Sequence, residues 1–176
     1  MKDRKLLNIE LGRISAEEYK TAAPSGVAVV LDNIRSAHNV GSVFRSADAF
    51  RVDRIWLCGI TPLPPSAEIH KTALGAEDSV EWQHGDDTVS VIKNLQKDGF
   101  TVVAVEQTEH SVSLRGFKCD FGKKYAFVFG NEVDGVSQEA VDACDFSLEI
   151  PQFGTKHSLN VSVCAGVVLW AATDKQ

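Results

Sequence analysis

Three short segments combine polar side chains and glycines at spacings that suit a ligand-binding or catalytic site. The first, from Asn39 to Arg45, reads NVGSVFR, and the second, from Gly130 to Gly135, is a glycine-bracketed turn that reads GNEVDG. The third places Ser158, Asn160 and Ser162 around the start of an apolar run. Glycines let a backbone approach a ligand closely, and the start of a helix offers free backbone N–H groups. These segments are therefore the candidates for chemistry.

Arg45 allows two interpretations. Its planar guanidinium suits the recognition of phosphate or carboxylate, and Gly41, four residues earlier, shares its face of the expected helix. The alternative is an exposed ion pair with Asp48, three residues later, which stabilises a helix by about 0.2–0.5 kcal/mol. The residues alone leave both interpretations open.

The third segment leads into a run from Val161 to Trp170 that is apolar on nearly every side. A helix of this kind has no face for water, so we expect it to be buried, with Ser158 capping its start. Asn160 and Ser162 then lie in the first turn, where a core helix does not need polar side chains. A site at this helix start and an ordinary capped core helix both fit the pattern.

These segments need a scaffold, and the apolar pattern predicts an α/β fold. Short apolar runs predict strands over residues 27–31, 54–59, 80–84, 100–105, 125–129 and 146–150. Helical patterns between them cover residues 16–22, 40–50, 66–74, 86–97 and 137–143, before the last apolar run. Strands that alternate with helices are typical of a parallel sheet flanked by helices.

Ligands of an open parallel sheet bind beyond the carboxyl ends of its strands. Four polar segments of this chain directly follow predicted strands, at residues 32–45, 106–110, 130–137 and 151–160. Since the three candidate segments fall among these four, we expect them to converge on one site.

The composition is that of a single globular domain. The 176 residues are 44% hydrophobic and 24% charged, and no apolar run reaches the roughly 18 residues of a membrane span. The first 20 residues are charged throughout and lack the apolar core of a signal peptide. The four cysteines are scattered, without a CxxC pair, so we expect a cytoplasmic protein without disulfides or a metal site.

Several common site motifs are absent from the sequence. It contains neither the GxGxxG fingerprint of dinucleotide-binding folds nor the GxxxxGK[ST] P-loop, and neither GxSxG nor HExxH occurs. The glycine-bracketed turn at residues 130–135 is therefore either a tight strand-to-helix connection or a different kind of cofactor loop.

Taken together, the three segments resemble the signature motifs of the SPOUT superfamily, specifically its SpoU (TrmH-type) RNA 2′-O-ribose methyltransferases. NxGxxxRxA at residues 39–47 is similar to motif one, FVFGNExxG at 127–135 to motif two, and IPxxGxxxSLNVS at 150–162 to motif three. The resemblance extends over residues 26–172. Asn131 stands where the family often has proline or serine.

The resemblance implies a fold, a cofactor and an assembly. The fold is a parallel α/β sheet with a C-terminal deep trefoil knot, formed by residues 26–176 after an extension of residues 1–25. The cofactor is S-adenosylmethionine, and the assembly is a homodimer with no metal. The residues that the family pattern assigns to the cofactor are Glu106, Gln107, Thr108, Gly130, Asn131, Gly135, Ile150, Ser158 and Leu159.

The implied reaction is methyl transfer to a ribose 2′-OH of RNA. The family pattern gives its polar catalytic centre as Arg45, Asn39, Glu132, Ser158 and Asn160. Family proposals make the arginine a base, but a guanidinium pKa above about 12 favours a clamp for phosphate and oxyanion instead. The two asparagines would orient the ribose or Arg45, and Glu132 would fix that network.

Because the chain carries a net charge of −6, its contacts with RNA would have to come from local clusters of basic residues. The candidates are Lys2/Arg4/Lys5, Arg51/Arg54, Arg115/Lys118, Lys123/Lys124 and Lys156/His157. In its small size and its lack of a preceding RNA-binding domain, the sequence resembles the family members that modify tRNA more than those that modify rRNA. We therefore expect tRNA as the substrate. Two alternatives remain open: a non-catalytic SPOUT-fold subunit that binds RNA and supports a partner, and another α/β enzyme with a nucleotide cofactor, such as a dehydrogenase.

Overall fold

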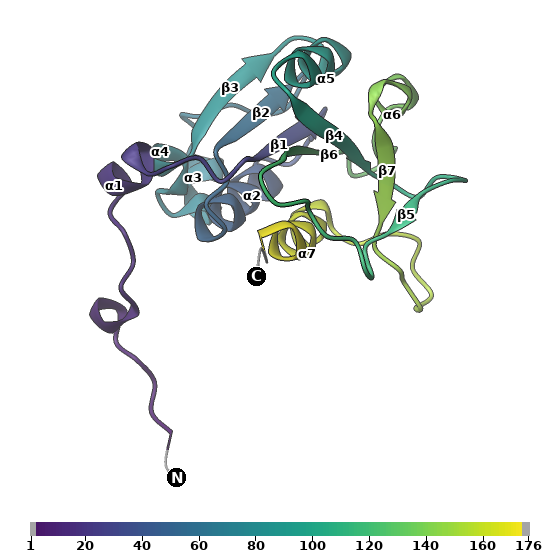
Figure 1. The fold of residues 1–176 in the computed structure, drawn as a ribbon. Coiled ribbons are helices and arrows are strands. Elements are labelled where there is room, and N and C mark those ends of the chain that lie inside the picture. The colour runs from purple at the N-terminus through teal and green to yellow at the C-terminus, as the bar shows by residue number, and fades with distance from the viewer. Residues whose placement is uncertain (1–2, 174–176) are drawn as a thin grey trace.

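A computed structural model of the protein describes residues 3–173, apart from the side chain of Asn8. Lys2, from the predicted basic cluster Lys2/Arg4/Lys5, lies outside the described residues. So do residues 174–176, the end of the predicted domain. A seven-stranded sheet forms the centre of the molecule, in the order β3-β2-β1-β6-β4-β7-β5 (Figure 1). Its pairings are parallel, which confirms the predicted parallel α/β sheet.

The strands and helices alternate along the chain. The strands are β1 (Val27–Asp32), β2 (Arg54–Cys58), β3 (Glu81–Gly85), β4 (Phe100–Val105), β5 (Val112–Ser113), β6 (Lys124–Phe129) and β7 (Phe146–Glu149). The helices are the 3₁₀ helix η1 (Asn8–Leu11), α1 (Ala16–Thr21), α2 (Ala37–Ala49), α3 (Ala67–Ala73), α4 (Ala76–Ser79), α5 (Thr88–Lys97), α6 (Gln138–Ala143) and α7 (Val161–Thr173). The sequence did not predict η1, α4 or β5, which have only two to four residues each.

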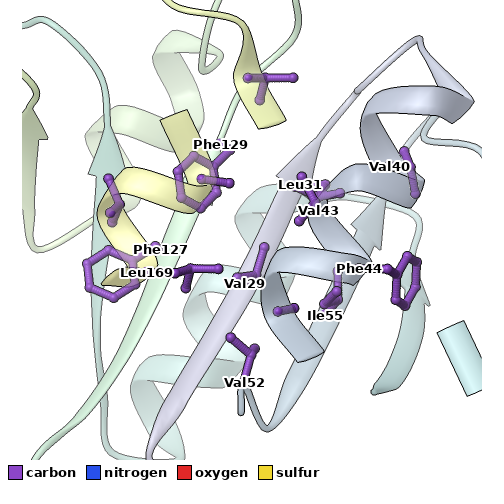
Figure 2. Close-up of a cluster of buried hydrophobic side chains, with 14 of the residues drawn as sticks. Val29, Leu31, Val40, Val43, Phe44, Val52, Ile55, Phe127, Phe129 and Leu169 are labelled. Atoms are coloured by element: carbon purple, nitrogen blue, oxygen red, sulfur yellow. The ribbon is translucent and has the colours of Figure 1, made fainter. Parts of the chain in front are cut away.

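Two apolar layers enclose the sheet. On one face, α2, α3 and α7 pack on side chains that alternate along the central strands, including Val29, Leu31 and Phe127 (Figure 2). On the other face, α5 and α6 cover the side chains between them, such as Val30 and Val128. Every residue of β1 is buried, because both faces of this strand are covered.

The side chains that cap α2 and α7 place the starts of these two helices differently from the sequence pattern. Helix α2 begins at Ala37, where the Ser36 hydroxyl accepts the Asn39 N–H at 3.3 Å, so Asn39 lies inside the first turn. Helix α7 begins at Val161, and its cap is Asn160, not Ser158. In both cases, the side chain that reaches the free N–H groups of the first turn sets the boundary.

The prediction of a fully buried last helix was wrong for this single chain. Val163, Val167 and Trp170 of α7 are 53%, 39% and 65% exposed. The opposite side of α7 packs against α2 and the sheet, for example through the buried Leu169. One apolar face of α7 is therefore only partly covered in the described chain, where the ring of Trp170 contacts that of Phe50.

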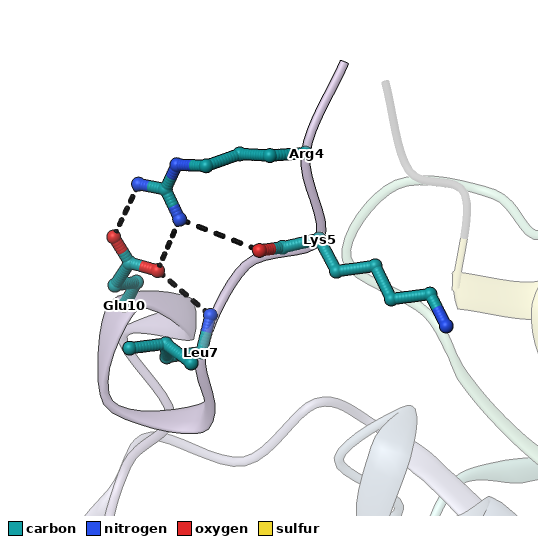
Figure 3. A network of polar contacts seen from close by, with 4 residues as sticks. All are labelled: Arg4, Lys5, Leu7 and Glu10. Atoms are coloured by element: carbon teal, nitrogen blue, oxygen red, sulfur yellow. Dashed lines mark hydrogen bonds and ion pairs between the residues drawn. The ribbon is translucent and has the colours of Figure 1, made fainter.

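Residues 3–15 extend away from the sheet (Figure 1). A local polar network gives this segment its shape: the Arg4 guanidinium donates to both Glu10 carboxylate oxygens at 2.9 and 2.7 Å (Figure 3). The Leu7 N–H donates to the same carboxylate at 2.7 Å. These contacts lower the pKa of Glu10 to about 2.

Candidate functional site

A pocket of about 510 Å³ opens beyond the carboxyl ends of β4, β6 and β7. Eight of the nine residues predicted to bind a cofactor line it: Glu106, Gln107, Gly130, Asn131, Gly135, Ile150, Ser158 and Leu159. The ninth, Thr108, lies one residue beyond the part of its loop that lines the pocket. The loops after three strands therefore converge, as the sequence pattern predicts for a parallel sheet.

Two glycines allow the turn after β6 to close tightly. A Cβ atom at Gly130 would lie 2.0 Å from both the carbonyl carbon of Gly135 and the nitrogen of Val136. At Gly135, where φ is +72°, a Cβ would lie 2.2 Å from Glu106 Oε2. Any larger residue would displace backbone at the first position and the Glu106 carboxylate at the second. Both glycines thus shape the pocket wall.

Hydrogen bonds tie the three pocket loops together. The Glu106 carboxylate accepts the N–H of Gln107 at 2.7 Å and the N–H of Val136, in the second loop, at 3.1 Å. The Gln107 side-chain amide donates to the carbonyl of His157, in the third loop, at 2.8 Å. The wall of the pocket is therefore held by contacts between loops that lie far apart in sequence.

Glu132 joins the pocket to the segment that follows β1. Its carboxylate accepts the backbone N–H groups of Arg35 and Ser36 at 2.9 and 3.0 Å, and the Asn39 side-chain amide at 2.9 Å. Burial raises the pKa of Glu132, but these hydrogen bonds outweigh it and leave the pKa below the ordinary value of 4.5. Glu132 is therefore a carboxylate at neutral pH.

Asn160 extends this network to the start of α7. Its Nδ2 donates to Asn39 Oδ1 at 3.1 Å, while its Oδ1 accepts the Ser162 N–H at 2.9 Å and the Ser162 hydroxyl at 2.6 Å. Glu132, Asn39 and Asn160 thus form one continuous chain of hydrogen bonds. Three of the five predicted catalytic residues, each from a different motif, are brought together in this way.

The other two predicted catalytic residues are placed differently. Ser158 is exposed on the pocket wall. Arg45 is exposed on the outer face of α2 and does not line the pocket. Among residues 3–173, Arg45 has no ion pair, so the alternative of a surface pair with Asp48 is not formed. The Arg45 side chain is free to meet a ligand from outside.

Asp32 supports the site, although the sequence analysis did not single it out. This carboxylate, 1% exposed, ends β1 and accepts the Thr88 hydroxyl at 2.6 Å. It also accepts the N–H and the hydroxyl of Ser137, each at 2.9 Å. The sequence did contain a signal for this role, because Asp32 directly follows a fully apolar run. A carboxylate buried at that position needs several hydrogen-bond donors around it. Asp32 anchors the far end of the turn that carries Glu132.

Cys164 is partly buried and lines the pocket. Burial and the nearby charge of Glu106 raise the pKa of this thiol to about 12. Residues 3–173 contain no cluster of three or more His, Cys, Asp or Glu side chains that could hold a metal ion. Nor does this part of the chain contain a helix with the length and apolarity needed to cross a membrane.

The chain matches a known family over most of its length. Residues 26–170 match the model of the SpoU rRNA Methylase family. A tRNA (guanosine(18)-2′-O)-methyltransferase of Thermus thermophilus is 31% identical over 163 residues, which cover 93% of this chain and 82% of that protein. A 23S rRNA (guanosine-2′-O-)-methyltransferase of Neisseria meningitidis is 32% identical over 145 residues. That match covers 80% of this chain but only 55% of the Neisseria protein, so the chain spans about half of its length.

Solved structures have the same architecture. The TrmH/SpoU tRNA modifying enzyme of A. aeolicus superposes with a TM-score of 0.79 at 28% identity, covering 90% of this chain and 79% of that one. An rRNA methyltransferase of Sinorhizobium meliloti, solved with AdoMet bound, gives a TM-score of 0.75 at 28% identity. This second match covers 85% of this chain and 59% of the Sinorhizobium chain.

Proposed function

The chain belongs to the SpoU rRNA methylase family, and we propose on that premise that it transfers a methyl group from S-adenosylmethionine to a ribose 2′-OH of RNA. The observation that carries the proposal is the hydrogen-bonded chain of Glu132, Asn39 and Asn160 at the edge of the pocket. It joins one polar residue from each of the three motifs beside a cavity suited to a cofactor. A dehydrogenase or an unrelated nucleotide enzyme does not require this combination.

The pocket fits the proposed cofactor. Its volume of about 510 Å³ lies within the range of about 300–1,000 Å³ that is common for cofactor sites. The close approach of backbone at Gly130 and Gly135 gives the cavity a wall that a Cβ atom would disturb. Residues 157–159, which are exposed, and Glu106 line the pocket and would offer polar groups to the adenosine and amino-acid ends of the cofactor.

The cofactor would supply an electrophilic methyl group on a sulfonium. The ribose oxygen would bond to this carbon as the carbon–sulfur bond breaks and a neutral thioether leaves, and the hydroxyl proton would pass to solvent. We assign Asn39 and Asn160 to orienting the ribose, and Glu132 to holding Asn39 and the loop at Arg35 and Ser36. Arg45, exposed on α2, would bind the RNA phosphate next to the target ribose and stabilise the developing oxyanion.

We favour tRNA over rRNA as the substrate. Support comes from the Thermus tRNA enzyme, whose similarity extends over 93% of this chain, compared with 80% for the Neisseria rRNA enzyme at nearly the same identity. The proposal also includes a C-terminal trefoil knot within residues 26–176, preceded by the extension of residues 1–25, and a cytoplasmic location with the RNA. The return of α7 from the pocket loop to pack against α2 is compatible with such a knot.

The purified protein is expected to bind S-adenosylmethionine with a dissociation constant in the micromolar range, or about −8 kcal/mol. The physical reason is the pocket formed by three loops at the strand ends. Titration calorimetry measures this binding, and a methyl-transfer assay on bulk undermodified RNA measures the activity. Binding without transfer on any RNA would favour the non-catalytic subunit. Absence of both binding and competition by S-adenosylhomocysteine would remove the methyltransferase proposal.

We also expect a homodimer that uses the exposed face of α7. Val163, Val167 and Trp170 present apolar side chains to water in the single chain, and a second copy would cover them. Light scattering at micromolar concentration should give twice the chain mass of 19.1 kDa. Val167→Asp should shift the mass toward the monomer, whereas the same change at exposed Val112, on β5, should not. A monomeric wild-type protein would contradict this assembly.

A further inference from the structure

An exposed aromatic ring lies beside the pocket, in the loop between β7 and α7. Phe153 is 83% exposed, although a phenylalanine gains most when it is buried. The guanidinium carbon of Arg115 lies 5.7 Å from the centroid of its ring. A cation at this distance over the face of an aromatic ring is attracted by the ring quadrupole. The two side chains therefore form a platform with a charged side and an open aromatic side.

The platform lies at the carboxyl ends of the strands, where the pocket is. Ser113 of β5 pairs with Glu149, and the Leu114 N–H donates to the Glu149 carbonyl at 2.8 Å, so Arg115 begins its loop at the end of β7. Phe153 follows Gln152, which lines the pocket. In Figure 1, the loop after β7 runs beside β5 at the edge of the sheet. Neither Arg115 nor Phe153 itself lines the pocket, so the cofactor does not account for them.

The charge around the ring suits a nucleic acid. The chain carries a net charge of −6, yet two exposed cations are near Phe153: Arg115 lies over its ring, and Lys156 follows it by three residues in the same loop. Within the described part of the chain, neither cation forms an ion pair with a carboxylate. A ring with unpaired cations beside it can stack a base while the cations meet the adjoining phosphates.

We propose that Phe153 and Arg115 form a stacking platform for an unpaired base of the RNA, next to the nucleotide whose ribose enters the site. The base lies on the open side of the ring, and Arg115 stiffens the ring from the other side and contacts a phosphate. This inference rests on the proposed function, and it assigns to the substrate a single-stranded stretch beside the target. A fully paired helix cannot supply such a base, because its bases are stacked on one another.

The direct test measures the binding of a fluorescein-labelled single-stranded oligoadenylate by fluorescence anisotropy. Phe153→Ala is expected to weaken binding about tenfold, the effect of losing one stacked base. Phe153→Trp should restore binding because it keeps a flat ring, whereas Phe153→Leu, which is apolar but not flat, should not. Arg115→Gln should weaken binding and reduce its dependence on salt.

A matched control is available within the same protein. Phe121 is even more exposed, at 96%, but lies in the loop before β6, at the opposite end of the strands. Phe121→Ala removes the same ring and should leave oligoadenylate binding unchanged. Lys97→Gln serves in the same way for Arg115, because Lys97 is an exposed cation in the last turn of α5, on the other face of the sheet.

Methyl transfer on bulk undermodified RNA gives a second readout. Phe153→Ala should raise KM for RNA about tenfold, with kcat and the affinity for S-adenosylmethionine within about twofold of wild type. Equal oligoadenylate binding by wild type and Phe153→Ala would overturn the platform, as would a loss of cofactor affinity or of the dimer mass in that variant. Oligoadenylate binding that depends on Phe153 without methyl transfer on any RNA would retain the platform and reject the proposed activity.

Discussion

Replacing Arg45 with alanine is expected to lower methyl transfer by about 10² or more, the scale of losing one oriented charge-stabilising group. Cofactor affinity should stay within about threefold, because Arg45 does not line the pocket and contributes nothing to its walls. The expected split between turnover and binding follows from the exposed position of Arg45 on α2, from which it can meet RNA but not the cofactor. Single-turnover methyl transfer and titration calorimetry measure the two effects separately.

Two further variants define the role of Arg45. Arg45→Lys keeps the charge but loses the planar fork, so a two-point grip on phosphate predicts little recovery of turnover. Near-normal turnover in the lysine variant would mean that charge alone is sufficient. Lys93→Ala, which removes one positive charge from the exposed side of α5 on the other face of the sheet, should leave turnover unchanged. Intact turnover in Arg45→Ala would end the catalytic assignment.

The second large effect is expected for Glu132→Gln, with methyl transfer falling about 10- to 100-fold. The carboxylate accepts three donors, from Arg35, Ser36 and Asn39. Glutamine offers one oxygen and turns its amide N–H₂ toward a donor, so at least one charge-assisted hydrogen bond of about 1.5–3 kcal/mol is lost. Asn39 and, through it, Asn160 then lose their fixed orientation. Steady-state kinetics should show the loss mainly in kcat.

The pH dependence of the free energy of unfolding distinguishes the loss of the Glu132 hydrogen bonds in Glu132→Gln from a simple change of net charge. The folded-state pKa of Glu132 lies below its ordinary value of 4.5, so the charged form stabilises the fold above that value. The stability advantage of wild type over Glu132→Gln should be complete at neutral pH and disappear as the pH falls through the folded-state pKa. Glu139→Gln removes the same charge from an exposed position of α6 that lacks these donors, and it should leave methyl transfer unchanged.

Much of the scaffold follows from local sequence, because a parallel strand covered on both faces must be an apolar run. The six longer strands and their helices were predicted within a few residues of their observed bounds. The elements that were missed, η1, α4 and β5, are too short for a periodic pattern. The positions of β5 and β7 depend on pairing with strands far away in sequence, which periodicity does not encode.

The sequence predicted which residues belong to the site, but not how their side chains are arranged or which hydrogen bonds they form. The family motifs placed Asn39, Glu132 and Asn160 together, and their hydrogen bonds agree with that grouping. The role of Asn160 as the helix cap was missed because Ser158 is an equally good capping residue, and only the path of the backbone decides between them. The exposed face of α7 was missed because an apolar sequence does not say which neighbour covers it.

The pairing of β1 with β6 has a consequence for how the protein is made. Leu31 lies opposite Phe129, so the central strand leaves the ribosome roughly 100 residues before its second neighbour. At about 5–20 residues per second, one edge of this largely apolar strand stays unpaired for about 5–20 s during translation. The first half of the chain therefore emerges as an incomplete sheet with exposed apolar side chains and an unpaired strand edge. We expect nascent-chain chaperones to bind it until β6 has been synthesised.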